Sequence, residues 1–448
     1  MKVISKLITS IILLPLLLSN HSLSQNNLPG LFETPDWAKN LSIYEVNIRQ
    51  YTEAGTFKEF ENHLPRLNEV GVGILWLMPI NPIGEKNRKG SLGSYYSVKD
   101  YLAVNPEFGS MDDFKSLVNK AHAMGMYIIV DWVANHTAWD NVWAGTHPDF
   151  YTKDSAGNFV PPVQDWGDVI DLNYDNKNLW KEMINALKYW VKECDIDGYR
   201  CDVAGMVPVE FWIEARKELE KIKPVFMLAE WDTPEIHEAF DMSYDWNFHK
   251  IMNSIFKEEM TASDIIEHFT DDKKSFPADA IRMLFTSNHD ENSWNGTEFE
   301  RLGEAAETFA VLTCLLPGMP LVYSGQEAGF NKRLSFFDKD TIIWKEHPMK
   351  DIYKKLFVLR TFNQALLPQS SINFFDINDD DLLLFSRVKD DEKVFAIFNL
   401  SKDEKEFSFD DKSMNGNFRN YFTGELVDFS ISQNLKLNPW SYKIFVKQ

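Results

Sequence analysis

Cysteine and positive charge are both scarce in this chain, and each shortage excludes a class of protein. Only three of the 448 residues are cysteine, and so small and odd a number does not indicate a disulfide framework. Lysine and arginine number 46 against 67 aspartates and glutamates, which gives a formal net charge of −21. No cluster of basic residues stands out, and affinity for phosphate backbones depends on such clusters. We therefore expect free thiols and no nucleic-acid partner.

Long hydrophobic runs are also missing, apart from one short stretch near the N-terminus. Two lysines precede an apolar stretch over residues 7–18, which is followed by polar residues and a small-x-small site at residues 22–24. A membrane-spanning helix needs about 20 apolar residues, and this stretch is shorter and contains Pro15. The pattern is typical of a secretory signal peptide over residues 1–24. It predicts a secreted or periplasmic mature protein with no stable membrane insertion.

Short apolar stretches alternate with amphipathic ones over residues 43–324, which is the pattern of a parallel sheet covered by helices. The expected helices include Asp112–Met124 and Leu179–Cys194. The expected strands are Ile43–Asn47, Ile74–Met78, Tyr127–Asp131, Gly198–Asp202, Val225–Glu230, Met242–Asp245, Arg282–Ser287 and Leu321–Ser324. These units predict an α/β fold of the (β/α)8 TIM-barrel type. The alternative, a doubly wound open sheet, often carries a Gly-rich phosphate loop after its first strand, and none stands there.

Two segments depart from the barrel pattern. The connection after the third strand is too long for an ordinary loop, and its aromatic residues argue against disorder, so we expect an inserted excursion domain over residues 136–175. Beyond about Pro368, short alternating apolar stretches predict a C-terminal antiparallel β-sandwich. The expected domains of the mature chain are therefore a barrel over residues 25–367, which contains the excursion, and a sandwich over residues 368–448.

Three carboxylates, Asp202, Glu230 and Asp290, each stand at the end of a strand-like stretch. In a barrel, reactive side chains gather where the strands end. Cleavage of the acetal between two sugars needs one carboxylate at the anomeric carbon and one protonated carboxyl that gives a proton to the leaving oxygen. Asp202 and Glu230 can fill these roles, so the pattern indicates glycoside hydrolysis. Taken singly, an aspartate such as Asp202 could be an ordinary strand-end or capping residue.

Five short motifs follow one another along the chain. They are Asp131-Trp132-Val133-Ala134-Asn135-His136, Asp171-Leu172-Asn173, Gly198-Tyr199-Arg200-Cys201-Asp202, Glu230-Trp231 and Asn288-His289-Asp290. Their identity and order resemble the α-amylase family of glycoside hydrolases, and the resemblance covers nearly the whole mature chain. The segment around Asp100-Tyr101 also looks like the family's loop that supplies a stacking tyrosine, here Tyr96.

The resemblance implies a retaining mechanism and a role for each motif residue. Asp202 would attack the anomeric carbon, Glu230 would protonate the leaving oxygen and later activate water, and Asp290 would grip the sugar hydroxyls. The implied substrate-binding residues are Tyr96, Asp131, His136, Arg200, Trp231 and His289. The implied substrate is an α-1,4-linked glucan or maltooligosaccharide. Other tryptophans, Trp294 among them, are expected in the core.

The sequence around the carboxylates agrees with a nucleophile and an acid. Arg200 stands two residues before Asp202, hence on the same face of the strand, where its charge can lower the pKa of Asp202. Glu230 has apolar neighbours, and Asp290 is expected nearby. Desolvation and like charge should therefore raise the pKa of Glu230, as an acid at neutral pH requires.

One departure from the family pattern concerns the residues after Asp202. Many α-amylases carry a Lys-His pair there, which contacts the substrate and helps to hold calcium, whereas this chain has Gly205-Met206. We expect no cofactor to be required for the chemistry. A structural calcium ion stays compatible with the sequence, but only Asn135 is placed by a motif as a ligand, with Asp165 or Asp168 of the excursion as further candidates.

The same barrel hosts α-glucosidases, cyclomaltodextrin hydrolases and glucosyl transferases, and the sequence leaves open which activity this chain has. A catalytically silent glycan-binding protein would be expected to lack one of the three carboxylates, and all three are present. A barrel enzyme for phosphate-bearing metabolites would carry a Gly-rich phosphate site after its seventh and eighth strands. Gly325-Gln326-Glu327 offers little of that, since Glu327 would repel phosphate.

Overall fold

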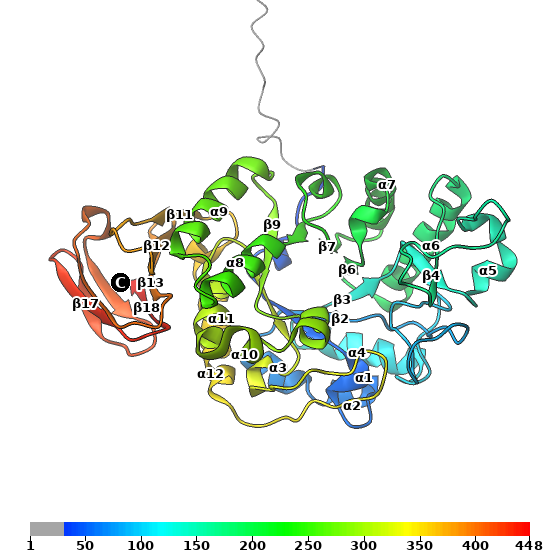
Figure 1. Cartoon of the computed structure of the whole chain (residues 1–448), viewed down its shortest axis with the longest axis horizontal. Helices are drawn as coiled ribbons and strands as arrows, with labels where there is room; N and C mark the ends of the chain where they lie inside the picture. The colour runs from blue at the N-terminus through cyan, green and yellow to red at the C-terminus, as the bar shows by residue number, and fades with distance from the viewer. Residues whose placement is uncertain (1–30) are drawn as a thin grey trace, which may run out of the picture.

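The computed structural model describes residues 31–448, so the predicted signal segment lies outside the described residues. Its centre is a closed barrel of parallel strands in which each strand pairs with the next barrel strand along the chain (Figure 1). The barrel strands are β1 (Ile43–Val46), β2 (Ile74–Leu77), β3 (Tyr127–Trp132), β6 (Gly198–Cys201), β7 (Phe226–Ala229), β8 (Met242–Tyr244), β9 (Ile281–Phe285) and β10 (Met319–Tyr323). β10 closes the barrel on β1, with Leu321 opposite Ile43. The (β/α)8 prediction is confirmed.

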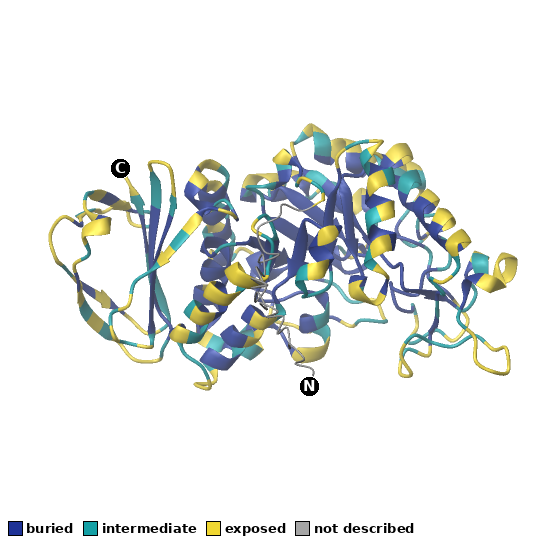
Figure 2. Cartoon of the chain, turned by 90° about the horizontal axis from the view of Figure 1, so that it is seen from above, coloured by how far each residue is buried: buried dark blue, intermediate teal, exposed yellow. Residues whose placement is uncertain are grey.

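Helices surround the barrel, and their outer faces are exposed while the strands are buried (Figure 2). They are α1 (Ile48–Tyr51), α2 (Phe57–Glu61), α3 (Leu64–Val70), α4 (Met111–Ala123), α6 (Lys177–Cys194), α7 (Val209–Glu220), α8 (Trp246–Phe256), α9 (Ala262–Ser275), α10 (Glu298–Leu302), α11 (Ala306–Leu315) and α12 (Pro348–Phe362). The two helices predicted by residue range form as α4 and α6. α4 starts with a capping box, in which Ser110 and Asp113 satisfy each other's backbone amides.

The excursion after β3 is built around a small antiparallel pair. β4 (His136–Ala138) pairs with β5 (Val169–Asp171), and the short helix α5 (Val142–Thr146) lies between them in the chain. This part projects from the side of the barrel away from the C-terminal sheets (Figure 1). The excursion therefore forms a small unit of its own at the side of the barrel.

The C-terminal region is a β-sandwich of unequal layers. A six-stranded antiparallel sheet contains β11 (Ser371–Phe374), β12 (Leu382–Lys389), β13 (Glu392–Asn399), β15 (Asn417–Asn420), β16 (Leu426–Asp428) and β18 (Ser441–Lys447), and β14 (Lys405–Phe409) pairs with β17 (Gln433–Leu437) in the second layer. Alternate residues of β12 take opposite faces. Leu382 and Leu384 pack between the layers, whereas Leu383 and Phe385 join the apolar cluster of the barrel and its helices.

The same alternation places polar side chains inside the barrel near the upper ends of its strands. Glu45, Trp76, Asp131 and Arg200 stand on four neighbouring strands, and each is fully buried. Asp131 lies directly opposite Arg200 in the parallel register of β3 and β6. The fold thus places a buried carboxyl group and a buried guanidinium at the same level of the barrel.

Arg387 on β12 offers a test of how the sandwich is held to the barrel. Its side chain is fully buried, and it donates to the Leu315 carbonyl at the end of α11 (2.8 Å) and to the Leu367 carbonyl (2.6 Å). Burial, together with the charge of Arg360, lowers the pKa of Arg387 to about 9. Arg387→Met leaves these carbonyls unpaired, so we expect the free energy of unfolding to fall by about 1–3 kcal/mol in urea titrations.

Arg419→Met is the matched control, because Arg419 stands on the same sheet but is exposed. We expect this variant to unfold within about 0.5 kcal/mol of the parent. Equal losses in the two variants would contradict the anchoring role of Arg387.

Candidate active site

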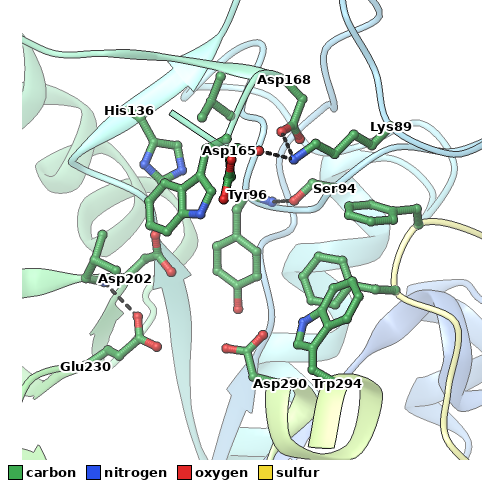
Figure 3. Close-up of a pocket in the computed structure, with 15 residues that line it drawn as sticks. Lys89, Ser94, Tyr96, His136, Asp165, Asp168, Asp202, Glu230, Asp290 and Trp294 are labelled. Carbon is green, nitrogen blue, oxygen red and sulfur yellow. Dashed lines mark hydrogen bonds and ion pairs between the residues drawn. The ribbon is translucent and has the colours of Figure 1, made fainter. Parts of the chain in front are cut away.

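A pocket of about 460 Å³ opens at the ends of the barrel strands and brings together five of the predicted site residues (Figure 3). Its lining consists of Lys89, Ser94, Tyr96, His136, Asp165, Trp166, Asp168, Val169, Asp202, Val203, Glu230, Asp290, Trp294, Phe336 and Phe337. Burial lowers the pKa of His136 to about 4, so its imidazole is neutral at pH 7 and can exchange hydrogen bonds with hydroxyl groups. Asp131, Arg200 and His289 lie in the buried layer around the three carboxylates.

Arg200 connects the carboxylates of this site. Its Nη1 is 2.8 Å from Oδ1 of Asp131 and 3.1 Å from Oδ1 of Asp202. Its Nη2 is 2.9 Å from Oε2 of Glu230, an ion pair without hydrogen-bond geometry. Its Nε donates to the hydroxyl of Tyr244 (3.1 Å). One guanidinium therefore contacts both carboxylates that were predicted to perform the chemistry.

The backbone of Val203, which follows Asp202, makes a second contact with Oε2 of Glu230. Its backbone N–H donates to Oε2 of Glu230 (2.8 Å). Val203 has φ 36° and ψ 47°, a left-handed conformation that is costly for a β-branched residue. The strained turn after β6 thus directs an amide at the carboxyl of the adjacent strand.

His289 is a second buried cation of the site. Nδ1 of His289 is 2.5 Å from Oε1 of Glu45, and its Nε2 is 2.7 Å from the hydroxyl of Tyr96 and 3.3 Å from Oδ2 of Asp290. Burial alone would lower the pKa of His289, but the charges of Asp290 and Glu45 raise it to about 9. His289 is therefore an imidazolium at neutral pH. The Tyr96 hydroxyl is also 3.0 Å from Oδ2 of Asp131 and donates to it.

The two central carboxyl groups both have raised pKa values. Burial and the negative charge of Glu230 raise the pKa of Asp202 well above its ordinary value, and the Arg200 charge opposes this without overcoming it. The Arg200 charge thus lowers the pKa of Asp202 as predicted, but burial, which the sequence does not reveal, has the larger effect. Burial also raises the pKa of Glu230, and the charge of Asp290 adds to it, as predicted. Asp202 and Glu230 titrate as a pair that retains a proton to higher pH than isolated carboxyls do.

Two tryptophans lie in places that the sequence did not predict. Trp231, expected to contact substrate, is absent from the pocket lining, and its indole packs over Gly205, where an added Cβ would lie 2.0 Å from the ring. Trp294, expected in the core, is 53% exposed and lines the pocket. The glycine that replaces the family's lysine thus makes room for Trp231.

Several residues of the site lie outside the five sequence motifs. Glu45 could have been noticed as a charged residue inside an apolar strand, and Trp76 donates its indole N–H to Asp131 (3.2 Å). Phe336 and Phe337 come from the long connection after β10, and Lys89 comes from the connection after β2. Their place in the pocket depends on contacts between distant loops, for which the sequence gives no local signal.

The contacts of Asn135 do not single out a calcium site. Its amide nitrogen is 3.2 Å from Nδ1 of His136, and its backbone carbonyl accepts from the Leu172 N–H (3.1 Å). Asp168, a candidate partner, is instead 2.9 Å from Nζ of Lys89. An ammonium group already neutralises this carboxylate, so the residues present do not fit a calcium ion well, and the chemistry below uses no metal.

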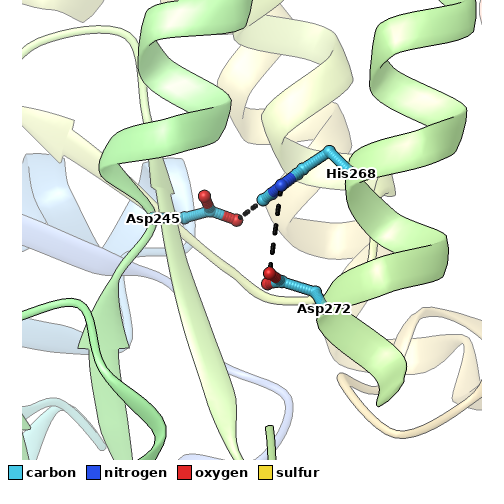
Figure 4. A group of neighbouring side chains, drawn as sticks. All are labelled: Asp245, His268 and Asp272. Atoms are coloured by element: carbon cyan, nitrogen blue, oxygen red, sulfur yellow. Dashed lines mark hydrogen bonds and ion pairs between the residues drawn. The ribbon is translucent and has the colours of Figure 1, made fainter. Parts of the chain in front are cut away.

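A separate group, Asp245, His268 and Asp272, is the one trio within residues 31–448 whose acidic or imidazole atoms lie close enough to share a metal ion (Figure 4). Nε2 of His268 is 2.9 Å from Asp245. Nε of Arg282 donates to Asp272 (3.0 Å), and this guanidinium also contacts Asp232. The Asp245 carboxylate raises the pKa of His268 against the effect of burial. Protein cations therefore balance these carboxylates, and the trio is an ion network rather than a metal site.

The barrel and its cluster of carboxylates at the strand ends define a glycoside hydrolase. Residues 45–365 match the family model of the α-amylase catalytic domain, and the chain belongs to the α-amylase family. The five motifs of the sequence lie within that matched range.

Known relatives agree in fold and in sequence. The crystal structure of an α-amylase from Lactobacillus plantarum is 30% identical, with a TM-score of 0.84 over 92% of this chain and 100% of that one. A noncanonic maltogenic α-amylase from Thermotoga neapolitana is 29% identical, also with a TM-score of 0.84, over 92% of this chain and 99% of that one. The Alpha-amylase 2 of Dictyoglomus thermophilum is 24% identical and covers 93% of this chain and 77% of its own length.

The raised pKa values predict the pH dependence of the reaction. If Asp202 attacks and Glu230 donates the proton, as the sequence predicts, kcat/KM should be bell-shaped, because that reaction needs one ionised and one protonated group of the pair. Activity would then fall at low pH as Asp202 gains a proton, and at high pH as Glu230 loses its own. Both limbs should lie above the ordinary carboxyl range, because burial raises both pKa values. Initial rates on an α-glucosyl substrate across the pH range test this.

The Glu230→Gln variant shows which group causes the alkaline limb of the pH profile. On α-glucosyl fluoride, whose leaving group needs little protonation, we expect this variant to keep the acidic limb and lose the alkaline one. On oligosaccharides it should be slower by about 10²- to 10⁴-fold. An unchanged alkaline limb on the fluoride would show that another group is the acid.

Proposed function

We propose that this protein is a retaining glycoside hydrolase that cleaves α-1,4-glucosidic bonds in starch-like glucans or maltooligosaccharides. The observation that carries the proposal is the pair of contacts from one buried guanidinium, that of Arg200, to Asp202 and Glu230. Two carboxyl groups held beside each other suit a double displacement, because no space for water is needed between the attacking carboxylate and the sugar.

In the first step, a carboxylate oxygen of Asp202 attacks the anomeric carbon while the bond to the leaving oxygen breaks. Glu230 transfers its proton to that oxygen, and a glycosyl ester on Asp202 results. In the second step, Glu230 accepts a proton from water, whose oxygen attacks the same carbon and releases Asp202. Each step inverts the anomeric centre, so the product keeps the α configuration.

The surrounding charges support the transition state of both steps. Positive charge develops on the sugar ring, and the carboxylates of Asp202 and Asp290 face the pocket where that ring would lie. The Nε2 atom of His289 is 3.3 Å from Oδ2 of Asp290, and this contact orients the Asp290 side chain. Tyr96 lines the same pocket and offers its ring face to a sugar.

Related activities are the alternative within the family. Relatives of this chain are called maltogenic amylase, neopullulanase and cyclomaltodextrinase, and the Bacillus subtilis maltogenic amylase is described as intracellular. An α-glucosidase, a cyclomaltodextrin hydrolase or a glucosyl transferase would use the same carboxylates. A silent glycan-binding protein is disfavoured, because the three carboxylates converge on one pocket.

We further propose that the mature protein is exported, on the strength of the N-terminal pattern alone. None of the helices within residues 31–448 is long and apolar enough to cross a membrane. N-terminal sequencing of protein recovered from the periplasm or the medium tests this proposal, and a chain that still begins at Met1 would contradict it.

Digestion of maltoheptaose, followed by proton NMR, tests linkage and stereochemistry together. We expect fresh α-anomer with short maltooligosaccharides, because a double displacement retains configuration. Asp202→Asn should lower the rate by a factor on the order of 10⁴ or more, while Asp112→Asn, at an exposed position of α4, should not change it. Fresh β-anomer, or an active Asp202→Asn variant, would overturn the proposal. Glucose as sole product would favour an α-glucosidase.

A further inference from the structure

The irregular segment after β7 carries the proposed acid, so its position decides where the acidic proton is delivered. Glu230 and the three residues that follow it lie in no helix or strand. The Trp231 carbonyl accepts from the Tyr244 N–H (3.1 Å), which fixes the first part of this segment. Asp232 does not line the active-site pocket, and its carboxylate instead contacts Nη2 of Arg282. A side chain from outside the pocket therefore binds the same segment.

Arg282 reaches Asp232 from the outer face of the barrel. Ile281 and Met283, its neighbours on β9, belong to the apolar cluster inside the barrel, so the alternation of the strand turns Arg282 outward. The Arg282 side chain is only 7% exposed. Its Nη1 donates to the hydroxyl of Ser243 on β8. The guanidinium thus joins two barrel strands to the segment after β7.

Carboxylates from two helices bind the same guanidinium. Nε of Arg282 donates to Oδ2 of Asp272 on α9 (3.0 Å), and its Nη2 is 3.8 Å from Oδ1 of Asp245, the residue that caps α8. His268 lies between these two carboxylates and is 2.9 Å from Asp245 (Figure 4). Contacts with β8, α8 and α9 therefore hold Arg282 in place independently of Asp232.

The contacts of the Glu230 carboxyl group explain why this outer support matters. The Val203 N–H and the Arg200 guanidinium both reach Oε2. The direction of the other oxygen, Oε1, then depends on where the backbone of Glu230 lies. Asp232 is two residues further along the chain, so a contact that fixes Asp232 also limits the movement of that backbone. Charge-assisted bonds to a guanidinium are directional and stronger than neutral ones, which suits them to this task.

We propose that Arg282 is a positioning residue for the acid, which holds the segment after β7 through Asp232 and so aims the Glu230 carboxyl group at the leaving oxygen. This inference rests on the proposed function and adds to it a residue that does not line the active-site pocket. A misplacement on the order of 1 Å can cost about 10²-fold in rate, so a tether of this kind affects the reaction without touching the substrate.

The test is Asp232→Ala on two substrates. Maltoheptaose has a leaving sugar that needs a proton, whereas the leaving group of α-glucosyl fluoride needs little protonation. We expect kcat/KM to fall by about 10- to 100-fold on maltoheptaose and to stay within about threefold on the fluoride. Asp232→Asn should restore most of the loss, because its amide oxygen still accepts from the guanidinium. A general loss of structure would lower both values alike.

Asp272→Ala is the matched control, because it removes a carboxylate from the same guanidinium but on α9 instead of the segment after β7. This variant should keep the parent's ratio between the two kcat/KM values within about twofold. Equal losses on both substrates in Asp232→Ala, or no loss on either, would overturn the positioning role. The same change of ratio in Asp272→Ala would also overturn it, since the effect would then not depend on the contact with Asp232.

Hydrogen–deuterium exchange separates this inference from the proposed function, because it needs no substrate. The Tyr244 amide, which donates to the Trp231 carbonyl, should exchange faster in Asp232→Ala than in the parent or in Asp272→Ala. Unchanged exchange would overturn the tether even if the enzyme is active. A parent that cleaves neither substrate, together with faster exchange in Asp232→Ala, would overturn the proposed hydrolysis and leave the tether standing.

Discussion

The buried guanidinium of Arg200 is the contact on which the rest of the site depends. It has no exposed surface, and it lies within 3.1 Å of oxygens from Asp131, Asp202 and Glu230. Burying several carboxylates without a partner would cost several kcal/mol for each charge. The strand register of the barrel sets Asp131 opposite Arg200. The positive charge of Arg200 therefore offsets the free-energy cost of burying these carboxylates.

Aromatic rings complete the surroundings of that charge. The guanidinium carbon is 5.0 Å from the ring centroid of Trp76 and 5.7 Å from those of Tyr96 and Tyr244. Such rings exclude water while still favouring a cation. Where water is excluded, the local dielectric constant is low, and each remaining electrostatic contact is stronger than it would be in water.

Charge balance explains how one site provides both a nucleophile and an acid. Arg200 and His289 carry positive charge, whereas Glu45, Asp131, Asp202, Glu230 and Asp290 can all carry negative charge. The carboxylates outnumber the cations, so the buried site favours retention of a proton. Glu230 receives it in the proposed mechanism, although Val203 and Arg200 both contact its Oε2.

Sequence reasoning was sufficient where a local pattern decides the outcome. All the barrel strands were predicted from the alternation of apolar and amphipathic stretches, and the structure contains them. It failed for Trp231 and Trp294, because their places depend on Gly205 and on the loops that meet at Ser91 and Asp338. It identified the lowering effect of Arg200 on the pKa of Asp202 but not the larger effect of burial, which depends on the whole fold.

Trapping the glycosyl-enzyme tests the central claim most directly. A fluorinated α-glucosyl fluoride that forms the intermediate quickly and releases it slowly would be incubated with the protein, and the peptides would then be analysed by mass spectrometry. We expect one added glycosyl group on the peptide that contains Asp202, and none in Asp202→Asn. A label on another carboxylate, or inactivation without a covalent label, would contradict the assignment of Asp202 as the nucleophile of a double displacement.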